Sequence, residues 1–204
     1  YRGGLNYLDL EEKKFYHYEY QEDNENSISN NTIYSLLYDS NNNLWVGTDK
    51  GLCLINNSNK KIKRFSVKRD FFNYMNLDIS PELSVRVIFE DNVGNIYVGM
   101  LSFGLFQLQK ADSSFKRMDI QGYFSVQTIF QDSKNNLWMG TSTGLFLIDD
   151  FTNTVYTKFN TQNGLPSDLI HGILEDEDNY LWISTSAGLV KFKNAVNNPH
   201  STDF

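Results

Sequence analysis

A nine-residue phrase occurs four times in this 204-residue chain and constrains its fold more than any other feature. A complete copy reads Leu-Trp-Val-Gly-Thr-x-x-Gly-Leu, and its aromatic residue falls at Trp45, Tyr97, Trp138 and Trp182, in steps of 52, 41 and 44 residues. Repeats of this length, with several short strands in each, are typical of β-propellers. The sequence therefore predicts an all-β fold, a β-propeller fragment of about four to five four-stranded blades.

Residues 31–65 show how one repeat supplies four strands. Ile33–Tyr38 is a nearly continuous apolar run, as expected for a strand that is buried on both faces. Leu44–Thr48 is rich in β-formers, Leu52–Ile55 is apolar, and Lys61–Phe65 is polar and alternating. Apolar character falls from the first strand to the last, which is expected of a blade with enclosed inner strands and a solvated outer edge.

The turn between the first and second strands follows a rule. An aspartate opens it, at Asp39, Asp91, Asp132 and Asp176, and three residues later stands Asn42, Gly94, Asn135 or Asn179. Asparagine and glycine tolerate a positive φ, and aspartate accepts hydrogen bonds from the backbone amides that follow it. The pattern predicts a type I turn closed by a left-handed residue. The later glycines, Gly51, Gly104, Gly144 and Gly188, are expected to serve the next hairpin in the same way.

The repeats divide the chain into blades and one insertion. The expected blades are 1–18 (partial), 31–65, 84–118, 125–159 and 169–193 (partial), with an inserted loop at 66–82. An open arc of blades exposes apolar flanks. We therefore expect a fragment of a longer array or a set of blades completed by a partner chain; closure of a small ring through Leu5–Phe15 is the alternative. The loop either carries function or is a tolerated insertion.

Charge and hydropathy exclude several classes of partner. The net charge of −7 argues against binding to nucleic acid or to an anionic membrane. No run of 18 apolar residues exists, so any link to a membrane would need a transmembrane segment outside this sequence. The single cysteine, Cys53, lies in an apolar strand and is expected to be buried.

Two forms of the repeat identify a family. Asn163–Ser167 followed by Ile173–Asp176 and the Trp182 phrase closely resembles the two-component regulator propeller repeat, and Asn26–Asn31 through Thr48 is similar to a second form of it. The resemblance covers almost the whole chain. Departures are Tyr97 in place of tryptophan, one extra residue before Gly104, and Ser184 in place of glycine.

The resemblance implies a location and a role. In that family the repeats form the periplasmic sensor of hybrid two-component regulators of Bacteroides-type bacteria, where two seven-bladed propellers precede a β-sandwich, a transmembrane helix, a histidine kinase and a DNA-binding response regulator. Known ligands are oligosaccharides from polysaccharide breakdown. The resemblance thus implies a non-enzymatic, periplasmic sensor segment that regulates glycan-utilisation genes, with kinase activity elsewhere and a homodimeric intact receptor.

Positions that break the repeat at the blade entrances are the candidate ligand-binding residues. The start of each first strand is expected at the channel end of a propeller, where ligands commonly sit. Planar polar groups with an aromatic platform suit a sugar. The candidates are Asn31, Arg86, Gln127 and His171, with Arg69 and Tyr74 from the long loop. The alternative is that all are ordinary loop and rim residues.

Other motifs have simpler interpretations. Asp39-x-Asn41-x-Asn43 imitates a calcium loop but lacks the glycine and the distant glutamate, which favours a hairpin turn. Neighbouring carboxylates at Glu175–Asp178 indicate a solvated turn rather than glycosidase chemistry.

The repeated tryptophans are expected in the core. No catalytic residue, metal or cofactor is expected. Two rival functions remain, an interaction scaffold for dimerisation and a propeller lyase or glycosidase.

Overall fold

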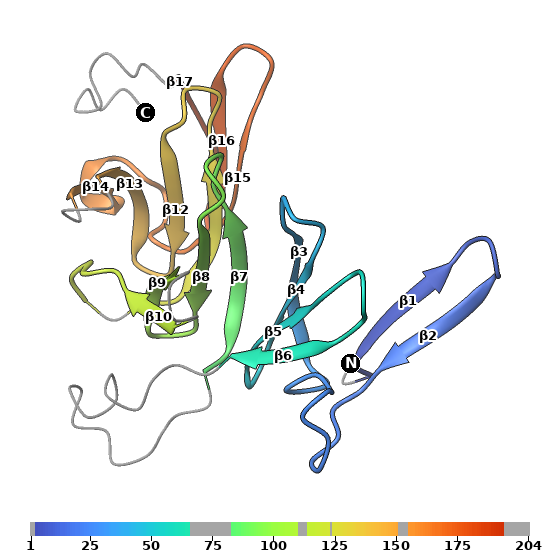
Figure 1. Ribbon diagram of the computed structural model, residues 1–204. Coiled ribbons are helices and arrows are strands. Elements are labelled where there is room, and N and C mark those ends of the chain that lie inside the picture. Colours follow the sequence, from blue (N-terminus) through green and yellow to red (C-terminus); the bar gives the residue numbers. More distant parts are fainter. Residues whose placement is uncertain (1–2, 66–82, 110–113, 123, 151–154, 194–204) are drawn as a thin grey trace. The chain divides into compact units, whose positions relative to one another are not determined.

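The computed structural model describes residues 3–65, 83–109, 114–122, 124–150 and 155–193. These residues form five consecutive β-sheets and one turn of 3-10 helix, η1 (Thr161–Asn163) (Figure 1). Three of the sheets have the four strands expected of a propeller blade, so the predicted all-β class is confirmed. No helix in these ranges is long and apolar enough to cross a membrane.

The chain forms two compact units. The first comprises residues 1–98 and 107–116, and the second comprises 99–106 and 117–204. The middle sheet contributes strands to both units. The predicted insertion at 66–82 lies outside the described residues.

Two sheets belong to the first unit alone. An antiparallel hairpin joins β1 (Leu5–Asp9) to β2 (Lys14–Tyr18). The first four-stranded sheet follows, in the order β3-β4-β5-β6. Its strands are β3 (Ile33–Tyr38), β4 (Leu44–Thr48), β5 (Gly51–Ile55) and β6 (Ile62–Phe65), which match the predicted strands to within one residue.

The remaining sheets repeat this order. The middle sheet contains β7 (Val85–Glu90), β8 (Ile96–Met100), β9 (Gly104–Gln109) and β10 (Ser114–Arg117). The second unit holds the sheet of β11 (Val126–Gln131), β12 (Leu137–Thr141), β13 (Gly144–Asp150) and β14 (Val155–Phe159). It also holds a three-stranded sheet of β15 (Ile170–Glu175), β16 (Tyr180–Thr185) and β17 (Gly188–Lys193).

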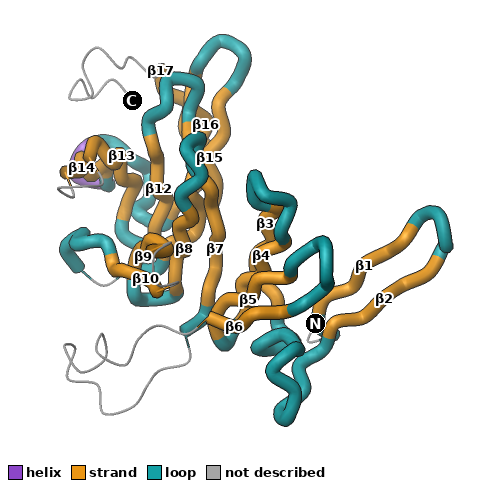
Figure 2. Tube along the Cα trace, in the orientation of Figure 1, coloured by secondary structure: helices purple, strands orange, loops and turns teal. Residues whose placement is uncertain are grey.

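In every sheet of three or four strands, short turns join the first strand to the second and the second to the third, and these turns are teal in Figure 2. The predicted left-handed residues are present, with φ of 60° at Asn42, 68° at Asn135 and 63° at Asn179. Gly51 and Gly144 also have positive φ, at 104° and 137°. The turn chemistry read from the sequence is therefore confirmed at the residues that carry it.

Three of the four repeated aromatic residues lie in the core, whereas Trp182, in the last described sheet, is only half-buried, so the prediction is wrong for Trp182. Trp45 and Trp138 are both 3% exposed, and Tyr97 is 1% exposed. In the second unit, Trp138 packs in a cluster with Leu145, Phe159, Ile170 and Ile183. In the first unit, Cys53 is fully buried in a cluster with Leu5, Ile28, Val46 and Ile55, and burial raises the pKa of its thiol. The core role predicted for Trp45, Trp138 and Cys53 is confirmed.

Two sheet faces are left uncovered within the described part of the chain. Leu36 of β3 is 52% exposed, whereas Ile88, at the same repeat position in β7, is 7% exposed. Leu189 of β17 is 63% exposed, whereas its counterpart Leu145 is fully buried. The expectation that Ile33–Tyr38 is buried on both faces is therefore wrong: none of its residues is buried, and Leu36 and Tyr38 are exposed, because no described sheet packs on that side of β3.

Ser184 stands where the other three copies of the phrase have glycine, and the structure gives a steric explanation. A Cβ at Gly140 would lie 2.6 Å from Ile170 Cγ2 and 2.7 Å from Thr128 Cγ2, so that position has no room for a side chain. Ser184 stands at the same repeat position but pairs with Gly172, which takes the place of Thr128. Gly172, which has no side chain, thus leaves room on the paired strand for the side chain of Ser184.

We expect Gly140→Ser to lower the free energy of unfolding by about 1–3 kcal/mol through overpacking. Ser184→Gly should cost about 1 kcal/mol or less, since it only adds backbone freedom in a strand. Urea unfolding of both variants measures the difference. Equal losses for the two would contradict the steric account.

Candidate ligand-binding site

A β-bulge occurs at the start of the innermost strand of three sheets. The pairing register shifts between Ile33 and Ser35, between Val126 and Thr128, and between Ile170 and Gly172. The extra residues are therefore Tyr34, Gln127 and His171, and Arg86 holds the same repeat position in β7. A bulged residue has no partner across the ladder, and bulges often re-aim a side chain next to functional sites. Three of the predicted site residues, Arg86, Gln127 and His171, thus share one repeat position, and a register shift is recorded at two of them, Gln127 and His171.

In the first unit the bulge position brings Arg86 and Tyr34 together. The guanidinium carbon of Arg86 lies 3.8 Å from the centroid of the Tyr34 ring, which is a close cation–π contact. The Tyr34 hydroxyl donates to Asp49 Oδ1 at 3.2 Å. The result is a partly buried arrangement of an aromatic ring on β3, a cation on β7 and a carboxylate in the turn between β4 and β5.

In the second unit His171 is exposed and its Nε2 lies 2.9 Å from the Ser186 hydroxyl. Gln127 is half-buried at the same repeat position. An imidazole and an amide offer both donors and acceptors, which are the groups that read sugar hydroxyls.

The other predicted residues have different environments. Asn31 fastens the N-terminal hairpin, because its side-chain oxygen accepts from the Tyr20 amide at 2.6 Å and its carbonyl accepts from the Gly4 amide at 3.0 Å. Arg69 and Tyr74 lie outside the described residues.

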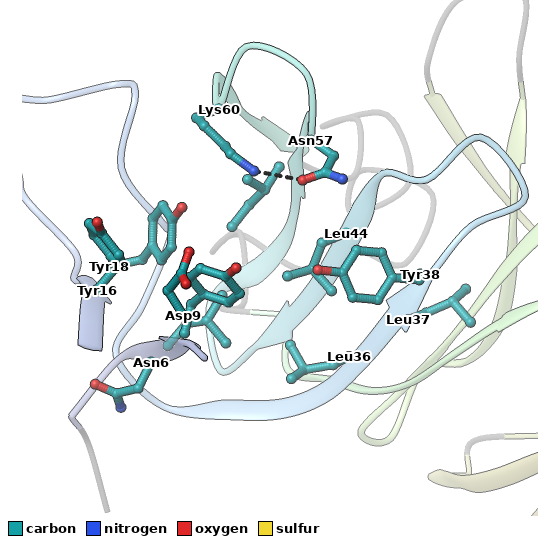
Figure 3. A pocket seen from close by; sticks show the side chains of 13 residues that line it. Asn6, Asp9, Tyr16, Tyr18, Leu36, Leu37, Tyr38, Leu44, Asn57 and Lys60 are labelled. Atoms are coloured by element: carbon teal, nitrogen blue, oxygen red, sulfur yellow. Dashed lines mark hydrogen bonds between the residues drawn. The ribbon is translucent and has the colours of Figure 1, made fainter. Parts of the chain in front are cut away.

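A second concave feature lies between the β1–β2 hairpin and the sheet of β3–β6. This groove has a volume of about 760 Å³, and Tyr16, Tyr18 and Asp9 face Leu36, Tyr38 and Leu44 across it (Figure 3). Asn57 and Lys60 lie at its rim, where the Lys60 ammonium donates to Asn57 Oδ1 at 2.6 Å. Ile88, at the repeat position of Leu36 in β7, is buried, so the groove marks a blade face that the described residues leave uncovered.

The repeated aspartates form hydrogen bonds that organise each blade. Asp132 Oδ1 accepts from the amides of Lys134 and Asn136 at 2.9 and 2.8 Å, and its Oδ2 accepts from the Trp138 indole N–H at 2.8 Å. Asp39 and Asp176 make the same bonds. The carboxylates are thus occupied by turn and indole donors, which supports the hairpin interpretation of the calcium-like motif.

This arrangement also shifts pKa values. The Trp182 indole N–H, aided by the Tyr180 amide and the Lys191 ammonium, holds the pKa of Asp176 at about 2 against the opposing effect of desolvation. Burial and the nearby Asp91 carboxylate raise the pKa of Tyr97, whose hydroxyl donates to Asp91 Oδ2 at 3.3 Å. Tyrosine at this position therefore still reaches the turn aspartate as tryptophan does.

Sequence reasoning missed three features of these sites. The first is the hydrogen bond from the tryptophan indole to the turn aspartate. The constant six-residue spacing from each aspartate to its aromatic residue could have predicted this bond. Glu90 accepts from the Ser40 amide and hydroxyl at 2.8 and 2.7 Å, and Glu175 accepts likewise from Ser133. These bonds join neighbouring blades. From the sequence, the pairs Glu90-Asp91 and Glu175-Asp176 predicted a turn and no contact between blades. The groove had no sequence signal.

Comparison with known proteins identifies the repeat. The family described as two component regulator propeller matches residues 27–50, 120–143 and 164–187. Each segment contains the first seven residues of a phrase, including Trp45, Trp138 or Trp182, and none of them contains Tyr97.

Longer proteins share parts of the chain. Histidine kinase P4 of Formosa agariphila is 33% identical over 90 residues, which are 43% of this chain and 6% of the kinase. The extracellular domain assigned to a hybrid two-component system of B. thetaiotaomicron has a TM-score of 0.75 and 26% identity, covering 97% of this chain and 25% of that one. Virginiamycin B lyase from Staphylococcus aureus has a TM-score of 0.66 at 16% identity, covering 94% of this chain and 63% of the lyase, and shares the fold alone. The chain thus spans a quarter or less of the first two proteins.

Proposed function

Because the chain is built from two-component regulator propeller repeats, we propose that it is part of the periplasmic ligand-sensing propeller of a hybrid two-component sensor kinase and response regulator. The ligand is an oligosaccharide from polysaccharide breakdown, and the output is the regulation of glycan-utilisation genes. The segment itself is not an enzyme, and kinase activity resides elsewhere in the protein.

The observation that carries the proposal is the set of bulge residues. The scaffold positions repeat from blade to blade, whereas the bulge position changes from Tyr34 to Arg86, Gln127 and His171. In the first unit the Tyr34 ring and the Arg86 guanidinium suit the apolar face and the hydroxyls of a sugar. In the second unit Gln127 and His171 offer amide and imidazole donors and acceptors. A ligand-binding surface needs different side chains at equivalent positions, whereas residues that only pack one blade on the next can repeat.

Signalling adds a requirement. A ligand shifts a two-state receptor only if it binds one state more tightly. Bonds between neighbouring blades, such as Glu90 to Ser40, offer a route by which ligand contact at one blade changes its packing on the next. We further propose that the intact receptor works as a homodimer.

Titration calorimetry of the protein that contains this chain, against oligosaccharides from polysaccharide digests, tests the proposal. Tyr34→Ala should weaken binding about tenfold to a hundredfold, since an aromatic contact is lost from the site. Tyr38→Ala, in the groove, is the matched control and should bind as wild type. Absence of heat with every oligosaccharide would contradict sensing, and product formation would favour the lyase or glycosidase alternative.

The scaffold alternative has one specific observation in its favour. The uncovered faces at Leu36 and Leu189 suit packing against further blades of the receptor rather than a small ligand. If Tyr38→Ala rather than Tyr34→Ala abolished oligosaccharide binding, the groove would be the ligand site and the bulge residues would belong to the scaffold.

A further inference from the structure

Arg86 differs from the other two arginines that the structure describes. Arg64 Nε donates to the Ser27 carbonyl at 2.7 Å, and Arg117 Nε donates to the Phe103 carbonyl at 3.0 Å. Arg86 Nε is buried, and none of the described residues accepts from it. Arg64 and Arg117 therefore hold loops together, whereas Arg86 has hydrogen-bonding capacity left over.

The surroundings fix the guanidinium without neutralising it. Its stacking on Tyr34 at 3.8 Å holds the guanidinium plane. The nearby carboxylate, Asp49, is engaged by the Tyr34 hydroxyl, and no described carboxylate forms an ion pair with Arg86. Arg86 as a whole is only partly buried, so the terminal N–H groups of its stacked guanidinium can still meet a bidentate acceptor.

Two further donors without partners lie on the same two strand segments. Among the described residues, the buried side-chain polar atoms without a partner are the hydroxyls of Ser35 and Ser84 and Arg86 Nε. Ser35 is in β3 and Ser84 directly precedes β7, and these strands contact each other in the first unit. All three groups can donate a hydrogen bond, and buried donors without acceptors are rare enough to need an explanation.

We infer that Arg86 binds an anionic group of the ligand, a carboxylate of a uronic acid or a sulfate ester, so that the site selects acidic oligosaccharides. The inference rests on the proposed function and specifies its ligand class. The chain carries a net charge of −7, which repels anions at long range. Selection for an acidic sugar must therefore come from this local contact.

The test is calorimetry with three tetrasaccharides: neutral galactotetraose, tetragalacturonate and a sulfated galactan tetrasaccharide. Wild-type protein should bind at least one acidic oligomer about tenfold to a hundredfold more tightly than the neutral one, as expected for a charge-assisted bidentate pair. Arg86→Met should remove that preference, and Arg86→Lys should restore only part of it because lysine is a point charge. Lys63→Met, which removes an exposed cation from the same unit, is the control for net charge and should keep the preference.

The outcomes separate the two proposals. Equal affinity for neutral and acidic oligomers overturns the anion site and leaves sensing intact, whereas no binding to any of the three counts against both. Tighter binding of tetragalacturonate identifies a carboxylate as the anionic group, and tighter binding of the sulfated tetrasaccharide identifies a sulfate ester.

An independent readout is the Nε–H NMR signal of Arg86, assigned with Arg86→Lys, during titration with galacturonate and inorganic sulfate. A saturable shift of Arg86 alone, with Arg64 and Arg117 unchanged, supports the site. Parallel shifts of all three signals, or none, overturn it.

Discussion

Replacement of Asp132 by alanine is expected to lower the free energy of unfolding by about 3–5 kcal/mol. The Asp132 carboxylate is buried, at 3% exposure, and accepts from two backbone amides, from Asn136 Nδ2 at 2.8 Å and from the Trp138 indole. The substitution leaves several donors without an acceptor inside the blade, and an unpaired buried donor costs about 1–3 kcal/mol. Chemical unfolding followed by tryptophan fluorescence measures the loss.

Two variants control this measurement. Asp132→Asn keeps the shape but has one accepting oxygen, so about half of the loss is expected. Asp178→Ala removes an exposed carboxylate from the equivalent turn of the last sheet and should change stability by less than about 0.5 kcal/mol. A loss for Asp178→Ala as large as that for Asp132→Ala would show that charge alone, and not the indole-linked turn, is responsible.

Leu145→Ala is expected to cost about 2–5 kcal/mol, because Leu145 is fully buried and its truncation leaves a cavity. Leu189 occupies the same repeat position, so Leu189→Ala is a matched control with the same chemistry. At 63% exposure it should cost less than about 1 kcal/mol. Thermal unfolding of the pair in this 204-residue chain alone compares the two losses.

The comparison also tests what covers the last sheet. In the longer protein that contains this chain, Leu189→Ala should become about as costly as Leu145→Ala, because a further blade packs on β17. A loss that stays below about 1 kcal/mol there would show that the face of β17 is solvent-exposed in the longer protein as well.

The strand plan could be predicted because local chemistry determines it. Asn42, Asn135 and Asn179 adopt the left-handed turn conformation for reasons internal to a few residues, and Trp45 and Trp138 are apolar enough to be placed in a core without knowing their partners. The blades follow from the recurrence of these signals.

Burial of whole faces could not be predicted in the same way. Leu36 and Ile88 are equivalent in sequence, and only the neighbouring sheet decides which is exposed. The bulge at Tyr34 is a shift in pairing between two strands and leaves no trace in the residues of either one. The contact of Arg86 with Tyr34 joins two blades 52 residues apart in sequence, a separation that no local pattern bridges.

The bulges also have a consequence for how such a chain can be changed. A side chain at a bulge takes no part in the ladder, so its replacement leaves the turn aspartates, the indole bonds and the glycine contacts as they were. Gln127 and His171 can therefore be replaced without loss of a ladder bond, whereas a change at Tyr34 or Arg86 also removes the contact between those two side chains. A library randomised at residues 127 and 171 would explore new specificities at little cost in folding, which makes the repeat a practical starting point for engineered binders.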